Sequence, residues 1–222
     1  MAMRPLLLSA ALLLAGCTSG LPSALDQIGQ QAVAVARGQQ PAPFTATRAS
    51  LAAAGFDQPL LVVTVPAKDE KAGLLRVATK GGTAVWRTTD ATVGLRAEGG
   101  LLSGTAGFGD DLYSAETAPL RDALAAQGGS YTRAMRHLDG AGGMLRGDAD
   151  CRLASDGPAR IEILGRAHEV TAFTERCTLA RPDRQQQIEN RFWVKPGSAF
   201  VWASEQWVHP ALGSILLERV IE

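Results

Sequence analysis

Three cysteines are the residues of this chain whose chemistry depends most on their surroundings. Cys17 directly follows an apolar run, Leu6 to Leu14, and two small residues. Cys151 and Cys177 stand far from it in the second half of the chain. A thiol can accept a lipid, form a disulfide or bind a metal, and the position of each cysteine decides between these reactions.

The segment 1–16 predicts an export signal. One basic residue, Arg4, precedes the apolar run, which is too short to cross about 30 Å of hydrocarbon as a helix. Leu14-Ala15-Gly16-Cys17 resembles a bacterial lipobox, in which the cysteine thiol accepts a diacylglycerol and the chain is cut before it. We therefore expect a signal peptide over 1–16 and fatty acid, palmitate included, at Cys17. The alternative is an ordinary signal peptide that contains a cysteine.

The expected anchor predicts a location in the bacterial cell envelope. One acyl chain binds a membrane only marginally, so the three chains of a processed lipoprotein are needed for a firm hold. Thr18 follows the cysteine where an aspartate would signal retention in the inner membrane. We expect the outer membrane, with the folded domain on its periplasmic side.

Cys151 and Cys177 are the remaining pair, and an oxidising compartment favours a disulfide between them. A metal site is the sharper alternative, but His137, His168 and His209 are isolated and no C-x-x-C or H-x-x-x-H spacing occurs. Buried free thiols are the other alternative. We expect the disulfide, and neither a metal nor another cofactor.

Asp110 and Asp111 are adjacent carboxylates in a glycine-rich turn. Such a pair could act as acid and base in glycoside cleavage, or bind Ca²⁺ through its oxygens. Neighbouring side chains of an extended chain point to opposite faces, however, and few other oxygen ligands are near. The structural alternative is that one of them caps the helix expected over 115–126, or its approach turn.

Aromatic residues gather near the C-terminal end of the chain and could stack on sugar rings or pack in the core. Phe192 and Trp193 are neighbours, so one of them is expected in the core. Trp207 is the aromatic residue that we expect to be exposed, beside Gln206 and His209. These three, with Asp110 and Asp111, are the candidate contacts for a glycan or a protein partner, and no catalytic residue is assigned.

Composition excludes several classes of protein. The chain has 222 residues, 22 basic and 22 acidic side chains, and a formal net charge of zero. That balance lacks the basic patch of a nucleic-acid-binding protein. A hydrophobic content of 46% is typical of a soluble domain and excludes a polytopic membrane protein.

The pattern of apolar runs predicts an all-β fold. We expect a tether with short peripheral helices at 25–37 and 47–54 in the segment 17–58. From residue 59 to 222, short apolar runs alternate with Gly-Gly and Pro-Gly turns, which is typical of an antiparallel meander. Roughly ten strands should curl into a barrel or a sandwich. Turns are expected at 155–158 and, as a type II turn, at 195–198.

Several segments resemble the group 4 capsule polysaccharide lipoprotein family, known as GfcB or YjbF. They are a glycine-rich acidic turn at 107–114, a following strand pair at 131–140, the paired cysteines Cys151 and Cys177, an N-x-F-W-like strand at 190–193 and an S-x-Q-W-x-x-P-like close at 204–210. The resemblance covers about residues 60–219. It implies a β-barrel-like fold and a role in capsule or exopolysaccharide production, and it implies no catalytic residues.

These observations predict a non-enzymatic accessory lipoprotein that assists assembly or export of a polysaccharide. Its expected partners are the membrane, through Cys17, and a polysaccharide or an export protein, but not nucleic acid. Two alternatives stay open: a periplasmic polysaccharide-modifying hydrolase that uses Asp110 or Asp111, and a purely structural envelope lipoprotein.

Overall fold

The computed structural model of the protein describes residues 44–138, 143–181 and 185–221. The predicted signal peptide, Cys17 and the helix expected over 25–37 lie outside these residues. Within the described part, no helix combines the length and the apolar character that crossing a membrane requires.

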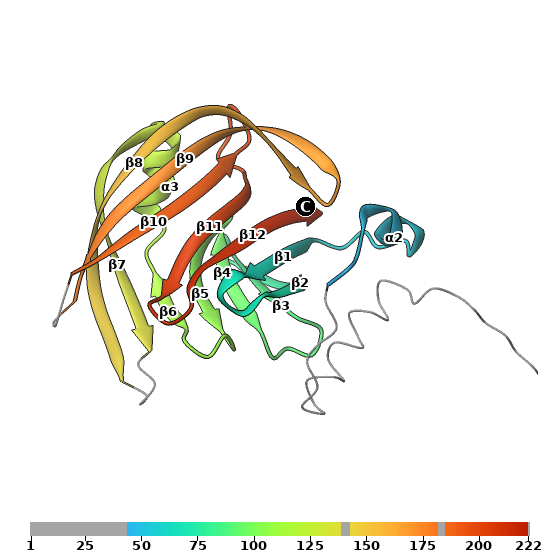
Figure 1. Cartoon of the computed structure of the whole chain (residues 1–222), viewed down its shortest axis with the longest axis horizontal. Coiled ribbons are helices and arrows are strands. Elements are labelled where there is room, and N and C mark those ends of the chain that lie inside the picture. Colours follow the sequence, from blue (N-terminus) through green and yellow to red (C-terminus); the bar gives the residue numbers. More distant parts are fainter. Residues whose placement is uncertain (1–43, 139–142, 182–184, 222) are drawn as a thin grey trace, which may run out of the picture.

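One antiparallel sheet of twelve strands forms the described domain, in the order β5-β4-β3-β2-β1-β12-β11-β10-β9-β8-β7-β6. Two meanders are joined where β12 pairs with β1, and the sheet curls into a nearly closed, barrel-like shape (Figure 1). The predicted all-β, curled antiparallel fold is confirmed. The strands are β1 (Leu60–Val65), β2 (Glu70–Lys80), β3 (Thr83–Arg87), β4 (Gly94–Glu98), β5 (Leu101–Ala106), β6 (Leu112–Ala115), β7 (Gly128–Leu138), β8 (Met144–Ile163), β9 (Arg166–Ala180), β10 (Gln185–Val194), β11 (Val201–His209) and β12 (Gly213–Ile221).

Side chains close the seam between the edge strands β5 and β6. The Thr105 hydroxyl donates to the Asp111 carboxylate at 2.7 Å and accepts from the Leu112 backbone N–H at 2.9 Å. The Arg96 guanidinium donates to the Tyr113 carbonyl oxygen. Edge strands otherwise expose polar backbone groups, and these contacts satisfy some of them.

Alternation of side chains along the strands fills the interior. The largest buried cluster includes Val63, Leu74, Trp86 and Leu217, from strands on both sides of the β1–β12 pairing. Fully buried aliphatic and aromatic side chains of this kind stabilise a fold by about 1.5–3 kcal/mol each. The largest part of the core therefore lies inside the curl, and a smaller cluster that includes Leu51, Leu60 and Val62 lies on the opposite face of the sheet.

Helix α3 (Ala118–Ala125) fills one region of the interior with Leu120 and Leu124, which pack with Phe173 and Phe192. It lies inside the curve of the long strands (Figure 1). The sequence predicted a helix over 115–126, and the observed helix begins later because 112–115 forms β6 and a proline occupies the first turn.

Helix α2 (Arg48–Ala53) packs on the outside of the sheet and confirms the second predicted helix. Thr47 caps it in a capping box with Ser50. Arg48 donates to the carbonyl oxygens of Ile163 and Val220, at 3.1–3.3 Å. The helix thus ties the tip of the long β8–β9 hairpin, which arches over the sheet, to the end of the chain (Figure 1).

The turn expected at 155–158 is wrong. Strand β8 runs through it, and a register shift between Ser155 and Gly157 forms a bulge in which Gly157 has a φ of +94°. The type II turn at 195–198 is confirmed, since Gly197 has a φ of +69° and the Ser198 N–H donates to the Lys195 carbonyl oxygen at 3.2 Å.

Candidate functional site

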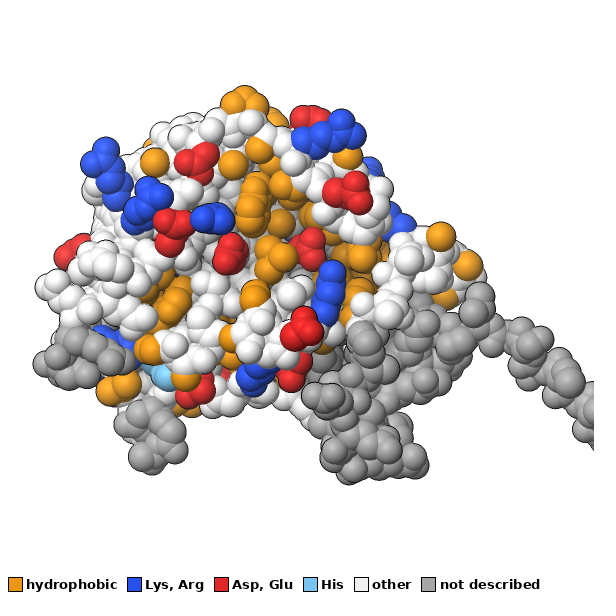
Figure 2. Space-filling view, in the orientation of Figure 1, with side chains coloured by type: hydrophobic (Ala, Val, Ile, Leu, Met, Phe, Trp, Pro, Cys, Tyr) orange, Lys and Arg blue, Asp and Glu red, His pale blue; other side chains and the backbone are white. Residues whose placement is uncertain are grey.

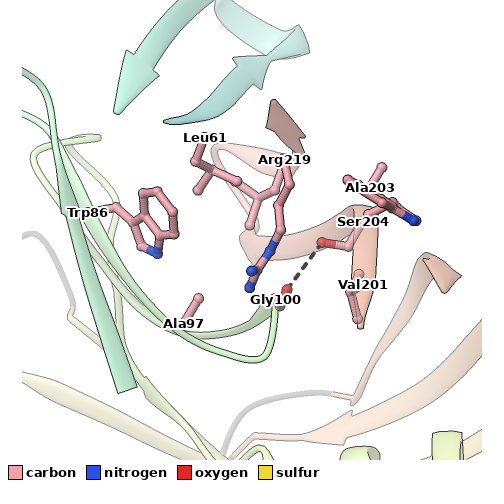
Figure 3. Close-up of a pocket in the computed structure, with 10 residues that line it drawn as sticks. Leu61, Trp86, Ala97, Gly100, Val201, Ala203, Ser204 and Arg219 are labelled. Atoms are coloured by element: carbon pink, nitrogen blue, oxygen red, sulfur yellow. Dashed lines mark hydrogen bonds between the residues drawn. The ribbon is translucent and has the colours of Figure 1, made fainter. Parts of the chain in front are cut away.

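A small cavity beside Trp86 is too small to hold a ligand. Leu61, Ala203 and Arg219 are among its lining residues, and the Ser204 hydroxyl donates to the Gly100 carbonyl oxygen at its edge (Figure 3). Its volume is about 10 Å³, which suffices for one water molecule at most. The chemistry of this protein must be sought elsewhere.

A buried polar network crosses the inner face of β7, β9 and β10. The Glu175 carboxylate is 0% exposed and forms a 2.9 Å ion pair with Arg133. It also accepts hydrogen bonds from the Tyr131 hydroxyl, at 2.5 Å, and from the Asn190 amide. The Asn190 side-chain oxygen then accepts from the Trp207 backbone N–H at 2.6 Å, which extends the network to β11.

This network is structural. Burial and the Glu175 charge raise the pKa of Tyr131 far above its usual value, so the phenol stays protonated and serves as a hydrogen-bond donor. A carboxylate that is fully buried and already satisfied by three donors does not reach a substrate. Sequence reasoning missed Glu175. The available signal was its place at an alternate position of a strand, two residues from Phe173 and from Cys177, both of which face the core.

A disulfide joins Cys151 to Cys177 beside this network. The two residues are directly opposite each other in the β8–β9 register, with Cα atoms 4.0 Å apart and a 2.03 Å S–S bond. Among the described residues they form a potential metal-binding group with Glu175. Thiolates bind metals, so sulfurs bonded to each other, beside a carboxylate engaged by Arg133, do not make a metal site.

Replacing both cysteines by alanine is expected to lower the free energy of unfolding by about 3 kcal/mol. The bridge restricts the unfolded chain by closing a loop of 26 residue steps. Urea unfolding of the wild type, of the wild type with reductant and of the double variant measures the effect. The wild type with reductant and the double variant should have the same free energy of unfolding. Thiol labelling of Cys151 or Cys177 in denatured, unreduced wild type would contradict the bridge.

Three predicted contact residues lie in a cluster at the ends of β7 and β11. The His209 Nδ1 atom is 3.5 Å from an Asp110 carboxylate oxygen, and Asp110 is 43% exposed. The Trp207 ring packs edge-on against His137, with centroids 5.0 Å apart. The structure therefore brings Asp110, His209 and Trp207 together, around a histidine that the sequence did not single out.

The predicted exposure of Trp207 is wrong, and Gln206 is not a surface contact either. Trp207 is 8% exposed and Gln206 is 3% exposed. The Gln206 amide accepts from the Leu102 N–H at 2.9 Å and donates to the Gly100 carbonyl oxygen at 3.0 Å. Gln206 thus fastens β11 to the start of β5 across the interior. The expectation that Phe192 or Trp193 is core is confirmed, because Phe192 is fully buried.

Asp111 holds the β5–β6 turn rather than a substrate. Its carboxylate accepts from the Thr105 hydroxyl and from the backbone N–H groups of Gly107 and Phe108, at 2.7–3.4 Å. Asp110 faces His209 instead, so the two carboxylates have different partners. This geometry agrees with the structural alternative, in which an aspartate caps a turn.

Buried His137 predicts a loss of stability in mild acid. Burial, followed by the positive charges of Arg181 and His209, lowers its pKa to about 4. An unfolded histidine titrates near 6.5, so between these pH values the unfolded chain binds more protons than the folded one. The free energy of unfolding should fall as the pH drops through this window, by up to about 3 kcal/mol from this residue.

The His137→Phe variant separates this contribution from those of other groups. Phenylalanine can keep a ring beside Trp207 and does not titrate. Urea unfolding at several values between pH 7 and pH 4 should give a shallower decline for the variant than for the wild type. Equal declines would contradict the lowered pKa.

A groove on the outside of the same end carries concentrated positive charge. We call it the basic groove; it has a volume of about 400 Å³ and is lined by Ala134, Met135, Arg136, Arg146, Gly147, Asp148, Ala180 and Arg181. On the face shown in Figure 2, by contrast, acidic and basic side chains are interspersed. On β9 and β10, for example, Glu189 pairs with Arg176 and Arg191 at 3.1 and 2.9 Å.

Fold and site together define an antiparallel, barrel-like domain braced by a buried ion pair and a disulfide. Residues 29–220 match the model of the YjbF family, described as group 4 capsule polysaccharide lipoprotein GfcB, and the chain belongs to this family. The resemblance inferred from the sequence is thereby confirmed. The family description associates the protein with the cell envelope and with capsule polysaccharide.

Two solved structures are similar to the chain. The hypothetical lipoprotein YmcC from Escherichia coli K12 has 19% sequence identity and a TM-score of 0.65, over 74% of this chain and 84% of that chain. A putative exported protein with a YmcC-like fold from Bacteroides fragilis has 9% identity and a TM-score of 0.32, over 73% and 93% of the two chains. No curated protein matches the chain.

Proposed function

We propose that this protein is an outer-membrane lipoprotein that assists the assembly or export of a capsule or exopolysaccharide without catalysing a reaction. The observation that carries the proposal is the family match over residues 29–220, whose description names both the lipoprotein and the polysaccharide. The predicted lipid on Cys17 would hold the domain at the membrane through which the polymer passes.

The geometry of the acidic residues supports an accessory role over hydrolysis. Glycosidases place two carboxyl groups on either side of one bond, about 5–9.5 Å apart. Here Asp111 is engaged by the β5–β6 turn, Asp110 faces His209, and Glu175 is fully buried. A hydrolase built on Asp110 and Asp111 would need both to turn toward one substrate.

Deletion of the gene tests the proposal. We expect less surface polysaccharide or shorter chains, with recovery when the wild-type gene is restored. Restoration with an Asp110→Asn/Asp111→Asn variant separates the accessory role from hydrolysis: the accessory role predicts recovery, and failure of a stably folded variant would favour the hydrolase. Unchanged polymer amount and length in the deletion strain would refute the proposed function.

A further inference from the structure

The basic groove brings together arginines from strands β7 and β8 and from the end of β9. Arg136 and Arg146 are directly opposite each other in the β7–β8 register; Arg136 is half-buried and Arg146 is exposed. Arg181 follows β9 and lines the same hollow. The lining holds three guanidinium groups and a single carboxylate, Asp148.

Arg136 and Arg146 are not neutralised by carboxylates among the described residues. The contact that holds Arg136 is a 3.4 Å hydrogen bond from its Nη1 to the Ser114 hydroxyl. Like charges directly opposite each other in an antiparallel pair are destabilising. Arg133, on the same strand but facing inward, is by contrast paired with Glu175 at 2.9 Å. An anion between the two outer arginines would offset their repulsion.

Small residues create the space between the arginines. Ala134, Gly147 and Ala180 line the hollow, and a Cβ atom at Gly147 would lie 2.5 Å from the Ala180 carbonyl oxygen. Close approach of the two backbones therefore requires glycine there. The resulting volume, about 400 Å³, is within the range in which proteins bind small ligands.

A contact with Trp207 holds the Arg181 side chain in place at the groove. Its guanidinium lies 5.7 Å from the centroid of the buried Trp207 ring, a cation–π contact that positions the charge. Beneath it, His137 has a lowered pKa and is neutral at pH 7. The positive charge of the groove thus comes from arginine and persists at every physiological pH.

We propose that the basic groove binds the carboxylate of an acidic glycan chain. A planar guanidinium presents paired N–H donors that match the two oxygens of a carboxylate, and opposed arginines can engage one such group from two sides. Because the groove is open and lies on the outer surface, one sugar unit of a long polymer can bind in it while the rest of the polymer extends beyond the groove. The inference rests on the proposed function, because the family description supplies the polysaccharide and the groove supplies the charge that selects it.

Binding of hexagalacturonate to the full-length lipoprotein in non-ionic detergent tests this inference. Titration calorimetry at low salt compares it with fully methyl-esterified hexagalacturonate, which has the same length without the charge. Arg136→Gln/Arg146→Gln is compared with Arg152→Gln/Arg160→Gln, which removes the same charge from exposed positions of β8. We expect the groove variant to bind at least tenfold more weakly than the wild type and the control variant to bind as the wild type does.

Four outcomes would overturn the inference. The first three are equal binding of the charged and the esterified oligomer, equal loss in the two double variants, and no binding of hexagalacturonate by the wild type. In the fourth, the Arg136→Gln/Arg146→Gln variant binds hexagalacturonate as the wild type does but no longer binds phosphatidylglycerol in mixed micelles. That result would make the groove a lipid site. Any of these, together with polymer loss in the deletion strain, would leave the proposed function standing and remove the acidic-glycan site alone.

Discussion

Replacing Arg133 by methionine is expected to lower the free energy of unfolding by about 3–5 kcal/mol. The substitution leaves the Glu175 carboxylate fully buried with no compensating positive charge. Its remaining donors, from Tyr131 and Asn190, do not offset the cost of holding an anion in the interior. A buried ion pair need not add net stability, but breaking one is costly.

A double variant distinguishes the charge from lost packing. Arg133→Met/Glu175→Gln removes both charges and keeps an amide that Tyr131 and Asn190 can contact, so most of the stability should return. Arg152→Met, at an exposed position of β8, serves as the matched control and should cost little. Urea unfolding followed by circular dichroism measures all four proteins. A single variant as stable as the control would contradict the role assigned to the network.

Loss of the lipid at Cys17 is expected to abolish membrane attachment. Within the described residues the domain has no helix able to span a membrane, and the predicted acyl chains would supply the anchor. Cys17→Ala should end incorporation of labelled palmitate, whereas Cys151→Ala should retain it.

Attachment itself is best measured with a second change. Exchange of residues 1–17 for a signal peptide that is cleaved without lipidation should move the protein from the membrane fraction to the soluble periplasmic fraction. The wild-type protein, released only by detergent, is the reference. Retention of the exchanged protein in the membrane fraction would show that another part of the chain provides the anchor.

The class of fold could be predicted because its determinants are local. The continuous apolar run of β1, which is buried on both faces, and the turn residues at 195–198 can be recognised from neighbouring residues alone. The turn expected at 155–158 failed because the same residue types that make turns also make bulges, and the β9 partner strand keeps β8 extended through Gly157.

The site was harder to predict because strand irregularities and long-range pairing decide it. Gln206, Trp207 and Val208 are consecutive and all buried, since a register shift between Trp207 and His209 interrupts the alternation. The alternation of side chains along a strand therefore cannot predict the burial of Trp207. Arg133 and Glu175 are 42 residues apart, and Arg136 meets Arg146 only through the β7–β8 register. No local sequence pattern predicts either the Arg133–Glu175 ion pair or the opposition of Arg136 and Arg146.

Surface polysaccharide in a deletion strain tests the central claim most directly. Amount and chain length should be measured in the deletion strain carrying an empty vector, the wild-type gene, or the gene with the non-lipidated signal peptide, at matched protein levels. An anchored accessory lipoprotein predicts that the polymer is diminished or shortened without the protein and that only the lipidated form restores it. Polymer of unchanged amount and length in the strain with the empty vector would contradict the account.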